Sequence, residues 1–138
     1  MSALRCRSLF ISHSWSYGDA YERLVDLLDA ARRFRYQTYS VPKNDPVHNA
    51  PNIETLYDAI KNQMLFCNVV LILAGRNTAY NKWILRELRV AKKDFRKPIV
   101  AVRHWNHEWV SPMLSLAADR LVRWDTKSIV SAIRELDP

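Results

Sequence analysis

The stretch NVVLILA, residues 68–74, limits the possible folds of this chain more than any other feature. After its first residue it contains only apolar side chains. Its length suits a strand, because a membrane span needs about 18 or more such residues. A strand with one solvated face alternates apolar and polar residues, whereas a strand covered on both faces does not. We therefore expect residues 68–74 to form the central strand of a parallel sheet.

Strands and helices are expected to alternate along the whole chain. The further strands are expected at residues 8–12, 36–41, 98–102 and 120–124. Helices are expected at residues 19–34, 53–64, 82–95 and 125–136, with a short helix near 110–117. This alternation predicts an α/β fold of the flavodoxin-like, three-layer type, with a five-stranded parallel sheet in the order 2-1-3-4-5 and helices on both faces. Because no repeat or linker interrupts the sequence, we expect a single domain over residues 1–138.

Local signals predict how two helices begin and where the two cysteines lie. Asp19 is expected to cap the helix that follows it, and Asp125 or Thr126 the last helix. Cys6 and Cys67 are far apart in the sequence, match no metal-binding spacing and lie at or beside expected strands. We expect both to be reduced thiols in a protein core.

The charge and the N-terminal sequence bear on partners and location. The formal net charge is +7, which permits an anionic partner, but the basic residues are scattered and no RNA-binding signature or zinc-finger spacing accompanies them. A nucleic-acid partner is therefore not expected. The start of the chain lacks the apolar region of a signal peptide, and no segment reaches the length of a membrane span. These features predict a cytoplasmic protein that does not enter the membrane.

The expected strand order predicts where a ligand would bind. In open α/β sheets, ligands bind beyond the carboxyl ends of the strands, where the strand order reverses. Here that point lies between the first and third strands, where the loops at residues 13–18 and 74–81 meet. The loop at 42–52 contains three prolines and three asparagines and flanks them.

Glu87 lies on the helix that follows the central strand, close to this point. A helical wheel at about 100° per residue places the apolar stripe on Ile84, Leu88, Ala91 and Phe95, with Glu87 at its border and partly shielded. Two interpretations follow. Glu87 is either a helix-surface charge favoured by the helix dipole, by about 0.3–1 kcal/mol, or a group with a chemical role in the crevice.

Three segments of the chain resemble a TIR domain. LFISHS (9–14) resembles the first TIR strand, and NVVLILAGRNTAYNKWILREL (68–88) resembles the TIR strand, polar loop and W-x-x-x-E-L motif. KKDFRKPIVAV (92–102) resembles the helix-to-strand passage that follows. The resemblance covers nearly the whole chain and is closest to stand-alone bacterial TIR-like proteins, including the TIR components of Thoeris anti-phage systems. The 42–52 loop departs from receptor TIR domains, because it lacks their Pro-Gly pair.

The resemblance implies an enzyme that cleaves the nicotinamide–ribose bond of NAD⁺ and produces a cyclic or conjugated ADP-ribose signal. The Glu of W-x-x-x-E, which is Glu87 here, is then the catalytic residue, and NAD⁺ is a substrate rather than a cofactor. The resemblance further implies assembly with other TIR domains, a downstream effector that reads the product, and a contribution from Asp45 in the 42–52 loop. The residues expected to bind substrate are Ser12, His13, Ser14, Tyr17, Asp45 and Trp83.

Some of these residues are expected from their chemistry once NAD⁺ is the substrate. The chain has two glycines and no G-x-G-x-x-G motif, so other groups must bind the pyrophosphate. Ser12, His13 and Ser14 supply donors, while Trp15, Tyr17 and Trp83 offer stacking faces for a base.

Other functions are weighed against this one. A non-catalytic TIR module that acts by TIR–TIR assembly remains the main alternative, and incubation with NAD⁺ discriminates the two. A nucleoside deoxyribosyltransferase-like activity is more distant. The acids of a phosphoreceiver domain and the elbow motif of a serine hydrolase are absent from the sequence. His104, His107 and Glu108 match no metal motif, so no metal is expected.

Overall fold

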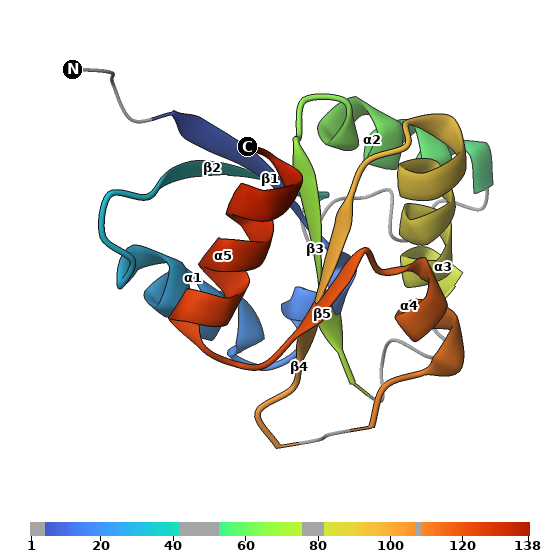
Figure 1. Ribbon diagram of the computed structural model, residues 1–138. Helices are drawn as coiled ribbons and strands as arrows, with labels where there is room; N and C mark the ends of the chain where they lie inside the picture. Colours follow the sequence, from blue (N-terminus) through green and yellow to red (C-terminus); the bar gives the residue numbers. More distant parts are fainter. Residues whose placement is uncertain (1–4, 42–52, 76–81, 107–108) are drawn as a thin grey trace.

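The computed structural model of the chain describes residues 5–41, 53–75, 82–106 and 109–138. Five parallel strands form one sheet in the order β2-β1-β3-β4-β5, which is the flavodoxin-like order that the sequence predicts (Figure 1). The strands are β1 Cys6–Ile11, β2 Arg35–Tyr39, β3 Val69–Ala74, β4 Ile99–Arg103 and β5 Arg120–Val122. The prediction of a central strand at 68–74 is confirmed: β3 pairs with β1 and β4, and all six of its residues are buried.

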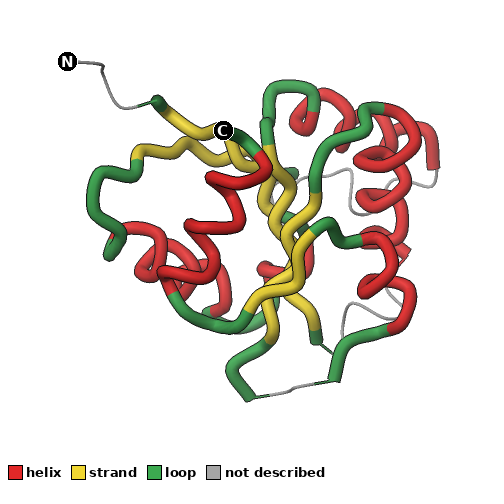
Figure 2. Tube along the Cα trace, viewed as in Figure 1, coloured by secondary structure: helices red, strands yellow, loops and turns green. Residues whose placement is uncertain are grey.

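The helices lie on both faces of the sheet and make it a three-layer structure (Figures 1 and 2). They are η1 His13–Ser16, α1 Ala20–Asp29, α2 Ile53–Met64, α3 Lys82–Arg89, η3 Val90–Asp94, α4 Pro112–Ala117 and α5 Thr126–Leu136. The helices α1 and α5 cover one face, and α2, α3 and α4 cover the other. None of the helices in the described part of the chain is both long and apolar enough to cross a lipid bilayer.

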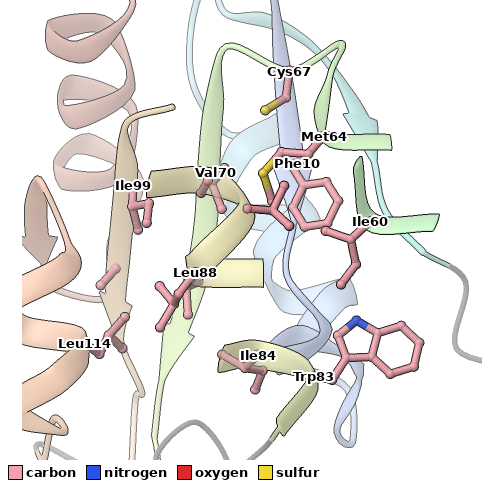
Figure 3. Close-up of a cluster of buried hydrophobic side chains, with 14 of the residues drawn as sticks. Phe10, Ile60, Met64, Cys67, Val70, Trp83, Ile84, Leu88, Ile99 and Leu114 are labelled. Atoms are coloured by element: carbon pink, nitrogen blue, oxygen red, sulfur yellow. The ribbon is translucent and has the colours of Figure 1, made fainter. Parts of the chain in front are cut away.

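Each face of the sheet has its own hydrophobic core, because alternate residues of a strand point to opposite faces. Val70 and Ile72 of β3 pack under α2 and α3, whereas Val69, Leu71 and Leu73 pack under α1 and α5. Figure 3 shows the first of these cores, where Ile60 of α2 and Ile84 of α3 lie against the sheet. A strand with apolar residues on both sides is thus required at the centre, and the sequence VVLILA provides it.

The predicted helix at 82–95 is wrong in one respect. It is α-helical only to Arg89 and continues as the π-helical turn η3, in which the Phe95 N–H donates to the carbonyl oxygen of Val90 at 3.0 Å. A π turn contains more residues than an α turn, so a helical wheel at constant spacing loses its phase there. Phe95, which the wheel places in the apolar stripe, is only partly buried, while Val90, at the start of the π turn, is fully buried.

The predictions for Asp19, Cys6 and the length of the first helix are also wrong. The Asp19 side chain makes no capping hydrogen bond and accepts instead from Arg23 Nε at 2.9 Å. Helix α1 ends at Asp29 rather than at Phe34, because the chain must turn before β2 begins. Cys6 lies exposed at the first residue of β1, whereas Cys67 is buried as expected. The Asp125 cap is confirmed, since its side chain accepts from Ser128 N.

Truncation of the central strand should cost the most stability. We expect Ile72→Ala to lower the free energy of unfolding by about 2–5 kcal/mol, because Ile72 is fully buried and its loss leaves a cavity. Chemical denaturation measures the change. The control is Leu116→Ala, at a side chain that is 88% exposed, which should shift the same quantity by no more than about 0.5 kcal/mol. Equal losses in the two variants would contradict the central position of β3.

Candidate functional site

The turn after β1 is fixed by Ser12. Its backbone N–H donates to the carbonyl oxygen of Leu71 at 3.0 Å, which holds the end of β1 against β3. Its hydroxyl oxygen accepts from the Ser14 N–H at 3.1 Å and so caps the short 3₁₀ helix η1. Serine at this position allows the chain to leave the strand and begin a helix at once.

Glu87 lies directly beneath this turn, on the second turn of α3. Its carboxyl oxygen Oε1 accepts from the Ser12 hydroxyl at 2.6 Å, and the His13 backbone N–H lies 3.1 Å from both carboxyl oxygens. Glu87 is only 1% exposed. The expectation of a partly shielded residue at the border of the helix is therefore wrong. The helical wheel predicts correctly which side of α3 carries Glu87, but the turn that leads into η1 covers that side chain.

Three aromatic rings lie at the same place. The His13 ring stacks on Trp83, one turn before Glu87, with centroids 4.5 Å apart and planes 12° from parallel. Tyr17, which is 39% exposed, meets the His13 ring edge-on at 5.6 Å. The structure thus brings together Ser12, His13, Tyr17, Trp83 and Glu87, while their catalytic and binding roles stay predictions.

Two residues of η1 are structural supports. The Ser14 hydroxyl accepts from the Leu73 N–H at 2.8 Å, and Ser14 is 3% exposed. Trp15 is 1% exposed, packs against Trp124 and donates from its indole N–H to the Leu71 carbonyl oxygen at 3.1 Å. The idea that Trp15 offers a free stacking face is therefore wrong. Contact between Ser14 and a substrate stays a prediction, and Asp45 lies outside the described residues.

Burial controls the charge of Glu87. Loss of hydration penalises the ionised form and raises the pKa of Glu87 from 4.5 to about 8, although hydrogen bonds from Ser12, His13 and Trp83 act in the opposite direction. The carboxyl group is therefore mostly protonated at neutral pH in the free protein. A strongly raised carboxyl pKa beside a cleft is typical of functional sites.

A pocket of about 310 Å³ opens next to this cluster, at the carboxyl ends of β1 and β2. Its volume is at the lower end of the range for small-molecule sites, about 300–1,000 Å³. Ser12 and His13 form its wall on the Glu87 side. The remaining lining residues are Ile11, Trp15, Ser16, Gly18, Tyr21, Glu22, Ser40 and Val41.

The sequence reasoning missed the far wall of this pocket. Tyr21 and Glu22 belong to the first turn of α1, and Ser40 follows β2 directly. The same rule that pointed to the ends of the first and third strands also points to the end of the second, because β2 is the neighbour of β1. The sequence signal that could have identified this wall was a polar residue, Ser40, near the end of the strand expected at 36–41.

The metal alternative finds no group of ligands in the described part of the chain, where no three His, Cys, Asp or Glu side chains gather. The His104 ring stacks on Trp105, and its Nδ1 accepts from the Asn106 N–H at 2.9 Å. His107 and Glu108 lie outside the described residues, so the absence of a metal site at these residues stays a prediction from the sequence.

The strand order, the short helix after β1 and the Trp83–Glu87 pair one turn apart together define a TIR-like domain. The chain belongs to the family described as Thoeris protein ThsB, TIR-like domain, whose model matches residues 10–108. That range includes the last two residues of β1, all of β2, β3 and β4, and every described residue of the Glu87 cluster. No curated protein sequence matches the chain.

Two solved structures resemble the chain in outline. The pilus assembly protein CpaE from Caulobacter crescentus is 13% identical, covers 95% of this chain and 89% of its own, and has a TM-score of 0.46. A flavoprotein in complex with FMN from Lactobacillus acidophilus is also 13% identical, with 96% and 99% covered and a TM-score of 0.46. At these scores neither structure bears on function.

The raised pKa of Glu87 makes stability depend on pH. Below about pH 4.5 the group is protonated in both the folded and the unfolded chain. Between about pH 4.5 and 8 only the unfolded chain releases the proton, so folded wild-type protein loses stability as the pH rises, by at most about 1.4 kcal/mol per unit. The Glu87→Gln variant cannot ionise and should not lose this amount.

Thermal denaturation at a series of pH values measures the effect. We expect the Tm of Glu87→Gln, relative to wild type, to increase from about pH 4.5 to about pH 8 and then level off. The control is Glu135→Gln, at a side chain that is 60% exposed, which should show no such trend. A difference in Tm that stays constant with pH would contradict a buried, protonated Glu87.

Proposed function

We propose that the protein is an enzyme that cleaves the nicotinamide–ribose bond of NAD⁺, with Glu87 as the catalytic residue. The observation that supports this most is a buried carboxyl group with a raised pKa, held by Ser12 and His13 beside a pocket at the carboxyl edge of the sheet. The family adds support, since the chain is a Thoeris-type TIR-like domain. The product we propose is a cyclic or conjugated ADP-ribose that serves as a signal in anti-phage defence.

A single carboxyl group is sufficient for this chemistry. When the bond between ribose C1′ and the nicotinamide nitrogen breaks, the electron pair moves to the nitrogen and the pyridinium becomes a neutral leaving group. No general acid is therefore needed. The ribose passes through an oxocarbenium-like state, as in glycoside hydrolysis, and the positive charge favours a nearby carboxylate. Water or a hydroxyl or ring nitrogen of the nucleotide then attacks C1′.

The surroundings of Glu87 are suited to stabilise the positively charged transition state more strongly than water would. A carboxyl group that water does not reach interacts strongly with a cation, because few solvent molecules screen the charge. We expect the cationic nicotinamide to lower the pKa of Glu87 and ionise it on binding. The face of Trp83 that the His13 ring covers is the place we propose for the nicotinamide ring, since an indole face attracts a planar cation. Movement of the His13 side chain would then uncover this face of Trp83, one turn before Glu87.

Removal of the negative charge should abolish most of the activity. We expect Glu87→Gln to lower the rate of NAD⁺ consumption by about 10²–10³-fold, the usual effect of losing one electrostatic group at a reacting centre. Mass spectrometry of the products after incubation with NAD⁺ measures both the rate and the kind of product. The matched control Glu135→Gln removes an exposed carboxylate on α5 and should retain wild-type activity.

Two outcomes would count against the proposal. A folded Glu87→Gln protein that consumes NAD⁺ as fast as wild type would mean that Glu87 has no catalytic role. A wild-type protein that associates with other TIR domains and leaves NAD⁺ unchanged would favour the interaction module instead.

The pH dependence gives an independent check. If the ionised form of Glu87 is needed, kcat/KM should rise about tenfold per pH unit below about pH 8 and become constant above it, since this ratio reports the pKa of the free enzyme. Initial rates of NAD⁺ consumption from about pH 5 to about pH 10 measure the profile. A ratio that falls with increasing pH would mean that the protonated carboxyl group is the active form.

A further inference from the structure

A second pocket, of about 340 Å³, lies at the amino end of the sheet, opposite the end where Glu87 is placed. Arg5 and Arg7 reach it from the start of β1, Arg32 and Arg33 from the turn after α1, and Arg134 from the last turn of α5. Phe34 completes the lining. Figure 1 shows the start of β1 beside the C-terminal end of α5. We call this place the arginine pocket.

Asp137 is the acidic partner of this cluster. Its carboxylate forms ion pairs with Arg5 and, at 3.6 Å, with Nη1 of Arg7. Among the described residues no acidic side chain lines the pocket itself, and none forms an ion pair with Arg32, Arg33 or Arg134. Five guanidinium groups thus face one side-chain carboxylate, which leaves a surplus of four positive side-chain charges, although Arg5 also donates to the oxygen of Pro138.

The Arg134 side chain is held in place at the pocket. Arg134 Nη2 donates to the carbonyl oxygens of Arg32 and Arg33 at 3.3 and 3.2 Å, and its guanidinium lies 5.6 Å from the centre of the Phe34 ring. Arg33 has a φ of +54°, in the left-handed region that a residue with a Cβ rarely adopts. Backbone strain of this kind is common at binding sites, where the surrounding structure maintains it.

Arg7 is the most buried of the five arginines that line the pocket. Its side chain is 14% exposed, and its Nη1 makes no hydrogen bond to the described part of the protein, because the carboxylate of Asp137 is too far away at 3.6 Å. A buried guanidinium N–H without a hydrogen bond is costly, and an anion in the pocket would supply the acceptor.

We propose that the arginine pocket binds a small ligand that carries at least two phosphate groups. Arginine forks bind phosphate oxygens through paired hydrogen bonds, and the surplus of four charges exceeds what a single phosphate neutralises. A compact pocket fits a small polyphosphate better than a nucleic acid, which needs a basic surface that follows its backbone. The proposal does not depend on the activity proposed for Glu87.

Calorimetric titration of the wild-type protein with inorganic pyrophosphate at low ionic strength tests the proposal. We expect saturable binding that weakens about tenfold or more in Arg32→Gln, because a charge-assisted hydrogen bond to the phosphate is lost. The Arg32 side chain is exposed, so its replacement should not disturb the fold. Arg7→Gln should weaken binding further. If Arg7→Gln fails to fold, the Arg32→Gln result alone decides.

Two control variants test whether pyrophosphate binds at the arginine pocket rather than elsewhere on the protein. Lys93→Gln removes an exposed positive charge from η3 and should bind pyrophosphate as wild type does. His13→Ala alters the Glu87 cluster and should also leave the affinity unchanged. Absence of binding in wild type, or equal weakening in Lys93→Gln, would overturn the proposal. It would also be overturned if His13→Ala abolished binding, or if a single-stranded oligonucleotide bound without competition from pyrophosphate.

Discussion

The contact between the Glu87 carboxyl group and the β1–η1 turn joins the two layers of helices at the carboxyl edge of the sheet. Glu87 comes from α3, which packs on one face, while Trp15 of η1 packs into the core of the other face. Ser12 connects them, because its hydroxyl donates to Glu87 and accepts from Ser14 N–H at the same time. The same contacts therefore form the candidate site and connect the two hydrophobic cores.

If Glu87 is catalytic, as we propose, this arrangement places stability and function in opposition at one side chain. A carboxyl group that is 1% exposed loses its hydration and recovers only part of that free energy through the hydrogen bonds of Ser12 and His13. An apolar residue of similar size would avoid the loss. Under the proposed function, a buried acid in this position would bind a cationic substrate away from water, and its protonated form limits the cost of burial in the free protein.

The fold was largely predictable from the sequence because its main determinant is local. An apolar run at 69–74 can only be covered on both faces, and the alternation of strand and helix patterns leaves few other arrangements. The grouping of His13 with Glu87 was predictable for the same reason, since parallel strands bring their carboxyl ends to one edge.

The burial of Glu87 was not predictable, because a helical wheel describes a single helix and does not include the β1–η1 turn that covers Glu87. The failure at Asp19 has a similar origin. Its side chain can cap the helix or pair with Arg23, and the backbone conformation at Asp19, with φ −100° and ψ 19°, decides between them. Ser40 could have been predicted from its place directly after β2, whereas the presence of Tyr21 in the far wall of the pocket depends on how α1 lies against β2, which no sequence period encodes.

The π turn η3 has a consequence for chains of slightly different length. A π turn is an α-helix that has accepted one additional residue, and here it lies after Glu87 and before β4. A related chain with one residue fewer between these two points can close the turn to ordinary α geometry while α3 and the strands keep their places. In a sequence alignment of such chains, the single-residue gap should therefore fall within residues 90–94. An alignment that places the gap within residues 82–89 would no longer match Glu87 with the corresponding glutamate of the shorter chain.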